Sequence, residues 1–142
     1  MKKYDDKKEF YDNMFDELTE LPLNDDIYVY FNKNNDIIDF STYHKDNYEK
    51  LNVLELMAIL RSFDIKNNKA SASIIQVIID LSDTTSIVNF AKKSELTLRS
   101  VENWIYGKSK PNIDAFIKLA NVSNIPSDLL FKTYEKLTKR FN

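Results

Sequence analysis

The sequence contains no cysteine, which excludes disulfide bonds, thiolate nucleophiles and thiolate metal sites. Its single glycine, Gly107, leaves no glycine-rich loop of the kind that cradles nucleotide phosphates. No stretch approaches the roughly 18 apolar residues of a membrane span, and no apolar run follows the lysines near the amino terminus. We therefore expect a cytoplasmic protein with no membrane span and no cofactor.

Charge is divided unequally along a chain whose composition is otherwise ordinary. Of the 142 residues, 43% are hydrophobic and 30% are charged, which suits one core or two small ones. Residues 1–66 hold 9 Lys or Arg against 15 Asp or Glu, whereas residues 67–142 hold 11 against 7. This difference predicts two domains, an acidic one at 1–66 and a basic one at 67–142.

The acidic half is expected to be a small α+β domain consisting of a helix, a β-hairpin and a second helix. Apolar residues at helical spacing predict the helices, and β-branched and aromatic residues predict the strands. The predicted elements are a helix ending near residue 20 before Pro22, strands at 27–31 and 36–40 around a turn at 32–35, a helix at 51–63 and a linker at 64–69. Because a hairpin is rarely stable alone, this sheet must pack on helices or on another copy.

The basic half has the helix signals of a bundle. Ser73-x-x-Gln76 has capping-box spacing ahead of the apolar run 74–81, which favours a helix there over a buried strand. Thr97 is a good N-cap for a short helix that Gly107 ends, and Asn112 is a good N-cap for the next one. That next helix is expected to carry its apolar residues at Ile113, Phe116, Ile117 and Ala120.

Residues 85–111 are the most informative segment, because they predict two short helices joined by a tight turn. Four small or apolar positions would hold the two helices together, while polar side chains fall on the opposite face of the second helix. The packing positions are Ala91, Leu96, Val101 and Trp104, and the outward positions are Arg99, Ser100 and Asn103. Residues 92–110 carry five basic and two acidic side chains, a local charge of +3.

Residues 72–131 resemble the Cro/repressor-type (XRE-like) helix-turn-helix DNA-binding family. The residues that carry the resemblance are Phe90-Ala91, Val101, Trp104, Gly107-Lys108-x-Lys110-Pro111, Leu119-Ala120 and Asp128-Leu129-Leu130. The resemblance implies a mainly α protein whose carboxy-terminal half is a five-helix, lambda-repressor-like helix-turn-helix bundle, preceded by the small α+β domain. It also implies binding to double-stranded DNA as a homodimer on paired half-sites, with residues 1–66 contributing to dimerisation.

By this resemblance the DNA-binding residues lie on the second helix of the pair and on the loop after it. Arg99 and Asn103 would face bases, and Ser100, Lys108 and Lys110 would lie nearer the backbone. Leu98, at the start of the helix, could touch a thymine methyl, pack as a cap contact or mark a protein-binding face instead. The full expected set is Thr97, Leu98, Arg99, Ser100, Asn103, Lys108, Ser109 and Lys110.

The sequence departs from the family pattern at three places. Ile87 stands where the family often has glutamine, Glu95 replaces the usual turn glycine, and Ile105 replaces an acidic residue. Glu95 must either adopt a left-handed backbone, at a cost of about 1 kcal/mol, or the turn must open differently.

Other residue clusters have ordinary structural interpretations. His44 is the only histidine, and without a second histidine or a cysteine it is expected to be a surface residue rather than a metal ligand or a base. The acidic face of the first helix is expected to be solvated rather than catalytic. Tyr28, Tyr30 and Phe31 could stack on bases, but only Lys33 supplies nearby positive charge. We therefore expect no enzyme activity.

Two functions remain as hypotheses. The first is a sequence-specific transcriptional regulator, acting as a repressor, from a phage or mobile element of a low-GC bacterium, a source that the abundance of Asn, Lys and Ile suggests. The alternative is an anti-defence (anti-CRISPR-like) inhibitor whose acidic amino-terminal domain binds a protein target, with the helix-turn-helix serving autoregulation or protein binding. The acidic front half distinguishes them, because a plain dimerisation domain does not need it.

Overall fold

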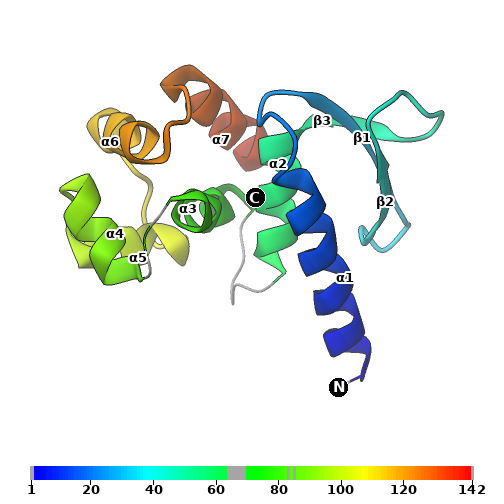
Figure 1. Ribbon diagram of the computed structural model, residues 1–142, viewed down its shortest axis with the longest axis horizontal. Coiled ribbons are helices and arrows are strands. Elements are labelled where there is room, and N and C mark those ends of the chain that lie inside the picture. The colour runs from blue at the N-terminus through cyan, green and yellow to red at the C-terminus, as the bar shows by residue number, and fades with distance from the viewer. Residues whose placement is uncertain (1, 64–69, 83, 85, 142) are drawn as a thin grey trace. The chain divides into compact units, whose positions relative to one another are not determined.

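The computed structural model describes residues 2–63, 70–82, 84 and 86–141 (Figure 1). The fold is mainly helical: these residues form seven helices and a small three-stranded antiparallel sheet. The chain divides into two compact units, Met1–Leu56 and Met57–Asn142, which we call unit 1 and unit 2. The division falls inside a helix, ten residues before the predicted boundary at residue 66. The predicted linker at 64–69 lies outside the described residues.

Unit 1 contains one long helix and the sheet. Its elements are α1 (Lys2–Leu18), β1 (Asp26–Phe31), β2 (Ile37–Ser41), β3 (Glu49–Asn52) and the start of α2 (Val53–Ser62). The predicted hairpin is confirmed, since β1 and β2 pair antiparallel with Val29 opposite Phe40. Asn35 has a φ of 63° in the turn between them, a conformation that asparagine tolerates well.

The prediction of unit 1 was wrong in one element. Residues 49–52 form a third strand, β3, which pairs with the other side of β1 and gives the order β2-β1-β3. Leu51 therefore lies in this strand, opposite Ile27, and the second helix begins at Val53 instead of residue 51. Residues 49–52 lack an apolar alternation, and the third strand they add gives the sheet more stability than an isolated hairpin has.

A reciprocal capping box starts α2. The Asn52 side chain accepts a hydrogen bond from the Glu55 N–H (2.7 Å), and the Glu55 carboxylate accepts one from the Asn52 N–H (3.0 Å). Both side chains are buried, so these bonds satisfy backbone donors that would otherwise lie unpaired at the start of the helix.

Unit 2 holds five further helices. They are α3 (Ala70–Leu81), α4 (Ile87–Ser94), α5 (Leu98–Ile105), α6 (Ile113–Ser123) and α7 (Ser127–Phe141). The apolar helix α3 is central, because it packs against α5, α6 and α7, while α4 packs against α5 and α6. The core side chains include Ile74, Ile78, Phe90, Val101, Leu119, Leu130 and Leu137.

Two expectations for unit 2 are corrected by the structure. Ser73 does not cap a helix, because α3 begins at Ala70 and Ser73 lies buried within it. In α6, Phe116 and Ala120 are buried as expected, but Ile113 and Ile117 are exposed. The helix prediction for 74–81 itself is confirmed.

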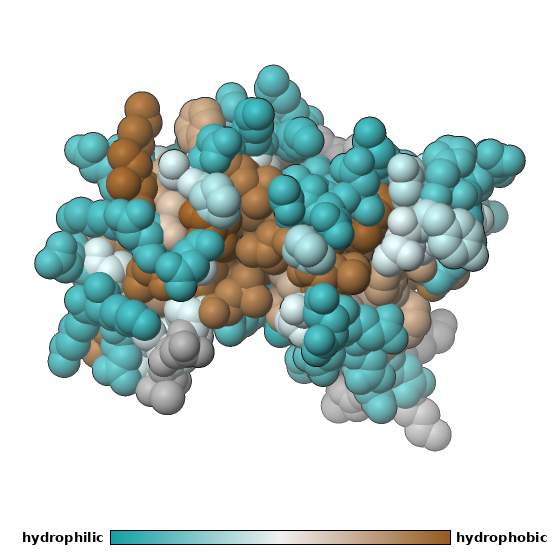
Figure 2. Space-filling view, turned by 45° about the horizontal axis from the view of Figure 1, so that its top comes forward, coloured by the Kyte–Doolittle hydropathy of each residue, from teal (hydrophilic) through white to brown (hydrophobic). Residues whose placement is uncertain are grey.

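Apolar side chains also reach the surface elsewhere. Hydrophilic residues cover most of the face drawn in Figure 2, with hydrophobic ones exposed between them. None of the helices in the described part of the chain is long and apolar enough to cross a lipid bilayer.

Candidate nucleic-acid interface

The turn between α4 and α5 is built around a left-handed glutamate. Glu95 has φ 59° and ψ 38°, so the first of the two backbone alternatives is the one found. The Glu95 N–H donates to the Lys92 carbonyl (3.2 Å), and the Leu96 N–H donates to the Ala91 carbonyl (2.9 Å). This pattern closes the end of α4 in the way that a glycine usually does.

Thr97 starts α5 immediately after this turn. Its hydroxyl accepts a hydrogen bond from the Ser100 N–H (3.1 Å) and donates one to the Ser100 hydroxyl (2.8 Å). The predicted N-cap is therefore confirmed. The first N–H groups of α5 lie beside two hydroxyls at the protein surface, an arrangement that suits contact with a phosphate oxygen.

The two faces of α5 differ as the spacing predicted. Val101, Trp104 and Ile105 are buried, and Trp104 is only 8% exposed. Arg99 is exposed and Asn103 is partly exposed, so neither polar side chain is enclosed by the bundle. Leu98 is 39% exposed at the start of the helix. A guanidinium, an amide and an aliphatic group thus reach solvent from one short helix.

Gly107 ends α5 and turns the chain into the basic loop. It has a φ of 71°, and the Lys108 N–H donates to the Asn103 carbonyl (2.8 Å) across it. Lys108, Ser109 and Lys110 are exposed in the loop that follows. Asn112 then caps α6 by accepting from the Ala115 N–H (2.8 Å), as predicted.

Basic side chains outnumber acidic ones over this region. The five basic side chains between residues 92 and 110 are all exposed, and none forms an ion pair with a carboxylate among the described residues. They are Lys92, Lys93, Arg99, Lys108 and Lys110. Each is free to meet a phosphate without first breaking an internal pair.

One basic residue near the turn was missed by the sequence analysis. Lys118 of α6 donates from its ammonium group to the Glu95 carbonyl oxygen (3.3 Å). It therefore joins the turn although it lies 23 residues away in sequence, a separation at which no local pattern reveals a contact.

The arrangement has a defined chemical capacity. A guanidinium can donate two hydrogen bonds to guanine, and an amide can pair with the edge of adenine in the major groove. The eight residues of α5 form a rod short enough to enter such a groove. Among the described residues, no cluster of three or more His, Cys, Asp or Glu side chains could hold a metal ion.

Comparisons of the chain with models of protein families, with curated proteins and with solved structures find no match.

Proposed function

We propose that the chain is a sequence-specific DNA-binding transcriptional regulator that acts as a repressor. In this proposal α4 and α5 form a helix-turn-helix, and α5 enters the major groove. The observation that carries it is the orientation of α5, which buries Val101 and Trp104 while Arg99 reaches solvent and Asn103 is partly exposed. The three helices α3, α6 and α7 support this pair as the rest of a five-helix bundle.

Each exposed group has a proposed role. Arg99 and Asn103 read base edges, and Leu98 contacts a thymine methyl group. Thr97, Ser100, Lys108, Ser109 and Lys110 contact the sugar-phosphate backbone, which fixes the register of the helix on the duplex. The exposed, unpaired lysines favour this division, because phosphate contacts release counterions and provide affinity without sequence preference.

The proposal is tested by gel shift of a duplex taken from upstream of the chain's own gene. Arg99→Ala should reduce the preference for that duplex over a scrambled one by about 1 to 3 kcal/mol, because a base contact is lost. Lys108→Ala should weaken binding to both duplexes alike and lower the slope of log affinity against log salt by about one unit.

A matched control removes a lysine from unit 1. Lys33 is exposed in the turn between β1 and β2, so Lys33→Ala makes the same change of charge outside unit 2. We expect it to leave the discrimination between the two duplexes intact. If Arg99→Ala bound every duplex as wild type does, the assignment of base reading to α5 would be wrong.

The acidity of unit 1 favours a second candidate function. Residues 1–56 carry 7 Lys or Arg against 14 Asp or Glu, which gives this unit a strong negative potential. An inhibitor that captures a basic protein through unit 1, with unit 2 serving autoregulation, would use this potential. Binding of a basic protein to unit 1 distinguishes the two candidates, since a pure repressor needs no protein ligand for unit 1.

A further inference from the structure

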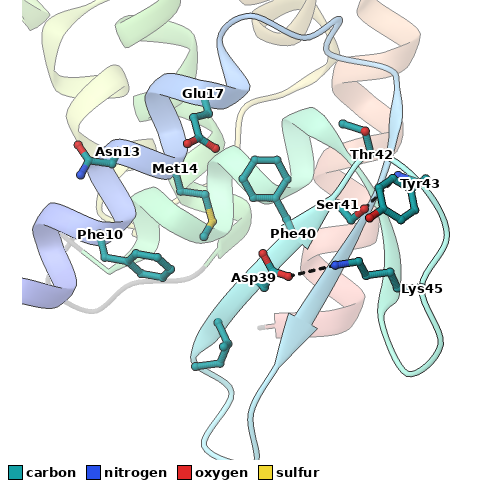
Figure 3. Close-up of a pocket in the computed structure, with 11 residues that line it drawn as sticks. Phe10, Asn13, Met14, Glu17, Asp39, Phe40, Ser41, Thr42, Tyr43 and Lys45 are labelled. Atoms are coloured by element: carbon teal, nitrogen blue, oxygen red, sulfur yellow. Dashed lines mark hydrogen bonds and ion pairs between the residues drawn. The ribbon is translucent and has the colours of Figure 1, made fainter.

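A groove runs between α1 and β2 within unit 1 (Figure 3). Its volume is about 560 Å³. One wall comes from α1 and the other from β2 and the loop that follows it. The lining residues are Phe10, Asn13, Met14, Glu17, residues 38–43 and Lys45. All of them belong to the same compact unit, so the groove is a feature of unit 1 alone.

Apolar side chains are left uncovered in this groove. Phe10 is 43% exposed and Ile38 is 47% exposed, while Met14 is buried below them. Figure 3 shows Phe10 and Met14 pointing from α1 toward β2, with Phe40 on the facing wall. Exposed apolar groups gathered in a hollow are typical of a surface that binds a ligand or a protein segment.

The strand that forms one wall is an edge strand. In the order β2-β1-β3, β2 has β1 as its only strand neighbour among the described residues. The Ile37 N–H at the start of β2 donates to the Tyr11 hydroxyl of α1 (3.0 Å), so this first donor is already satisfied. Farther along, the groove lies beside the strand, and an edge strand offers backbone groups to a second extended chain.

The groove carries a net negative charge, which favours a positively charged ligand. Asp39 is neutralised, because it accepts from the Tyr48 hydroxyl (2.7 Å) and pairs with the Lys45 ammonium (3.6 Å). The Glu17 carboxylate is exposed and has no side-chain partner among the described residues. One uncompensated negative charge therefore remains on the groove, within a unit that has twice as many acidic as basic residues.

From these features we infer that the groove docks an extended segment of a basic partner protein. The segment pairs with the free edge of β2, places an apolar side chain between Phe10 and Met14, and brings a lysine or arginine to Glu17. Nucleic acid is a poor occupant, because the charge of unit 1 repels phosphate. This inference is independent of DNA binding by α5 and stands or falls separately.

The test is a titration of the full isotope-labelled chain, followed by nuclear magnetic resonance. The probe is a ten-residue peptide of alternating valine and lysine. Amide signals of residues 13–17 and 38–43 should shift on binding, while those of α5 should not. The same peptide with glutamate in place of lysine should not bind. Methylation of all its backbone nitrogens should weaken binding at least about tenfold, because the methylated peptide can no longer donate to the edge strand.

Two charge-reversal variants separate the groove from general attraction between opposite charges. Glu17→Lys should abolish binding of the valine-lysine peptide. Asp16→Lys, a neighbouring exposed position on α1 that does not line the groove, should preserve most of it. Both substitutions change surface residues, so the fold should survive them.

Four outcomes would overturn the inference. The first is equal loss of binding in the two variants, and the second is no binding at millimolar peptide. The third is a shift of the groove amides with protein concentration in the absence of peptide, because the occupant would then be a second copy of the chain. Shifts produced by a DNA duplex at the same amides would also contradict a protein ligand.

Discussion

Three consecutive helices of unit 2 end in the same left-handed conformation, and each uses a different residue for it. Glu95 after α4 and Asn124 after α6 both have a φ of 59°, and Gly107 after α5 has a φ of 71°. In each case the next N–H donates to a carbonyl five residues back, to Ala91, Asn103 or Ala120. Glycine adopts this conformation without strain and asparagine tolerates it, whereas glutamate does not favour it.

Replacement of the strained residue should therefore stabilise the protein. Glu95→Gly removes a cost of about 1 to 2 kcal/mol in the folded state, partly offset by about 0.4 to 1 kcal/mol from the freer unfolded chain. We expect a net gain of up to about 1 kcal/mol in the free energy of unfolding, measured by urea titration. The carbonyl that Lys118 contacts is retained in this variant.

Asn124→Gly is the matched comparison, because it has the same φ and already holds a tolerant residue. Its gain should be smaller than that of Glu95→Gly. Equal changes at the two positions, or a loss of stability at position 95, would show that Glu95 is not strained.

Single-residue helix signals were predicted well where the signal was local. Thr97 and Asn112 cap their helices as expected, because a cap depends only on the next three residues. The prediction that Ser73 caps a helix was wrong, because Ser73 lies inside a helix that starts three residues earlier. The true capping box at Asn52 and Glu55 has the same spacing and was hidden because the helix was expected to begin before it.

At the scale of elements, the missed strand β3 shows that the periodicity of a sequence does not reveal pairing between distant segments. The segment Glu49–Asn52 has only four residues and buries its last two, so it shows no alternation of apolar and polar side chains. Its conformation depends on pairing with β1, whose paired residues lie 20 to 26 positions earlier in the chain. Likewise, Ile113 and Ile117 have helical spacing, but both side chains are exposed on α6.

The contact between α1 and β2 depends on a buried tyrosine. Burial raises the pKa of Tyr11 above its ordinary value of 10.0, partly opposed by the hydrogen bond from the Ile37 N–H. The folded chain thus holds its proton to higher pH than the unfolded chain does. This contribution to stability is complete below pH 10 and is lost as the pH rises through the folded pKa. Burial likewise raises the pKa of Tyr134, in unit 2, above its ordinary value.

The substitution Tyr11→Phe tests the contribution of the Tyr11 hydroxyl to stability. At neutral pH we expect a loss of about 1 to 3 kcal/mol, because the Ile37 N–H loses its acceptor. Above pH 10 the free energy of unfolding should fall less steeply in the variant than in wild type. Urea titrations at neutral and alkaline pH measure both effects. Tyr43→Phe, which alters an exposed side chain, should leave stability at neutral pH unchanged, and a similar loss there would contradict the role of the Tyr11 hydroxyl.

At the scale of the whole molecule, the two units have opposite charge. Unit 1 is acidic, whereas residues 57–142 carry 13 Lys or Arg against 8 Asp or Glu. The sequence predicted an acidic half and a basic half from the uneven distribution of charged residues, but it placed the boundary at residue 66, whereas the compact units divide after Leu56. It also predicted the outward side chains of α5, which depend on helical period alone. The groove in unit 1 was not predictable, because it joins residues 10–17 with residues 38–45 through the fold.

Two copies of the chain should bind one palindromic duplex if the proposed function holds. Half-sites separated by one helical turn, about 10 base pairs from centre to centre, should bind two chains, and a single half-site should bind one. Sedimentation equilibrium of the complex measures this ratio. A ratio of one chain per palindrome at saturation would contradict the dimeric arrangement.

Trp104, on the buried side of α5, has a practical consequence because it is the only indole in the chain. Its emission reports the solvation of one point in unit 2, and unit 1 contributes no such signal. A shift toward the red therefore records the opening of the bundle alone. Comparison of this intrinsic fluorescence with a probe of total backbone order separates the melting of the two units without any label.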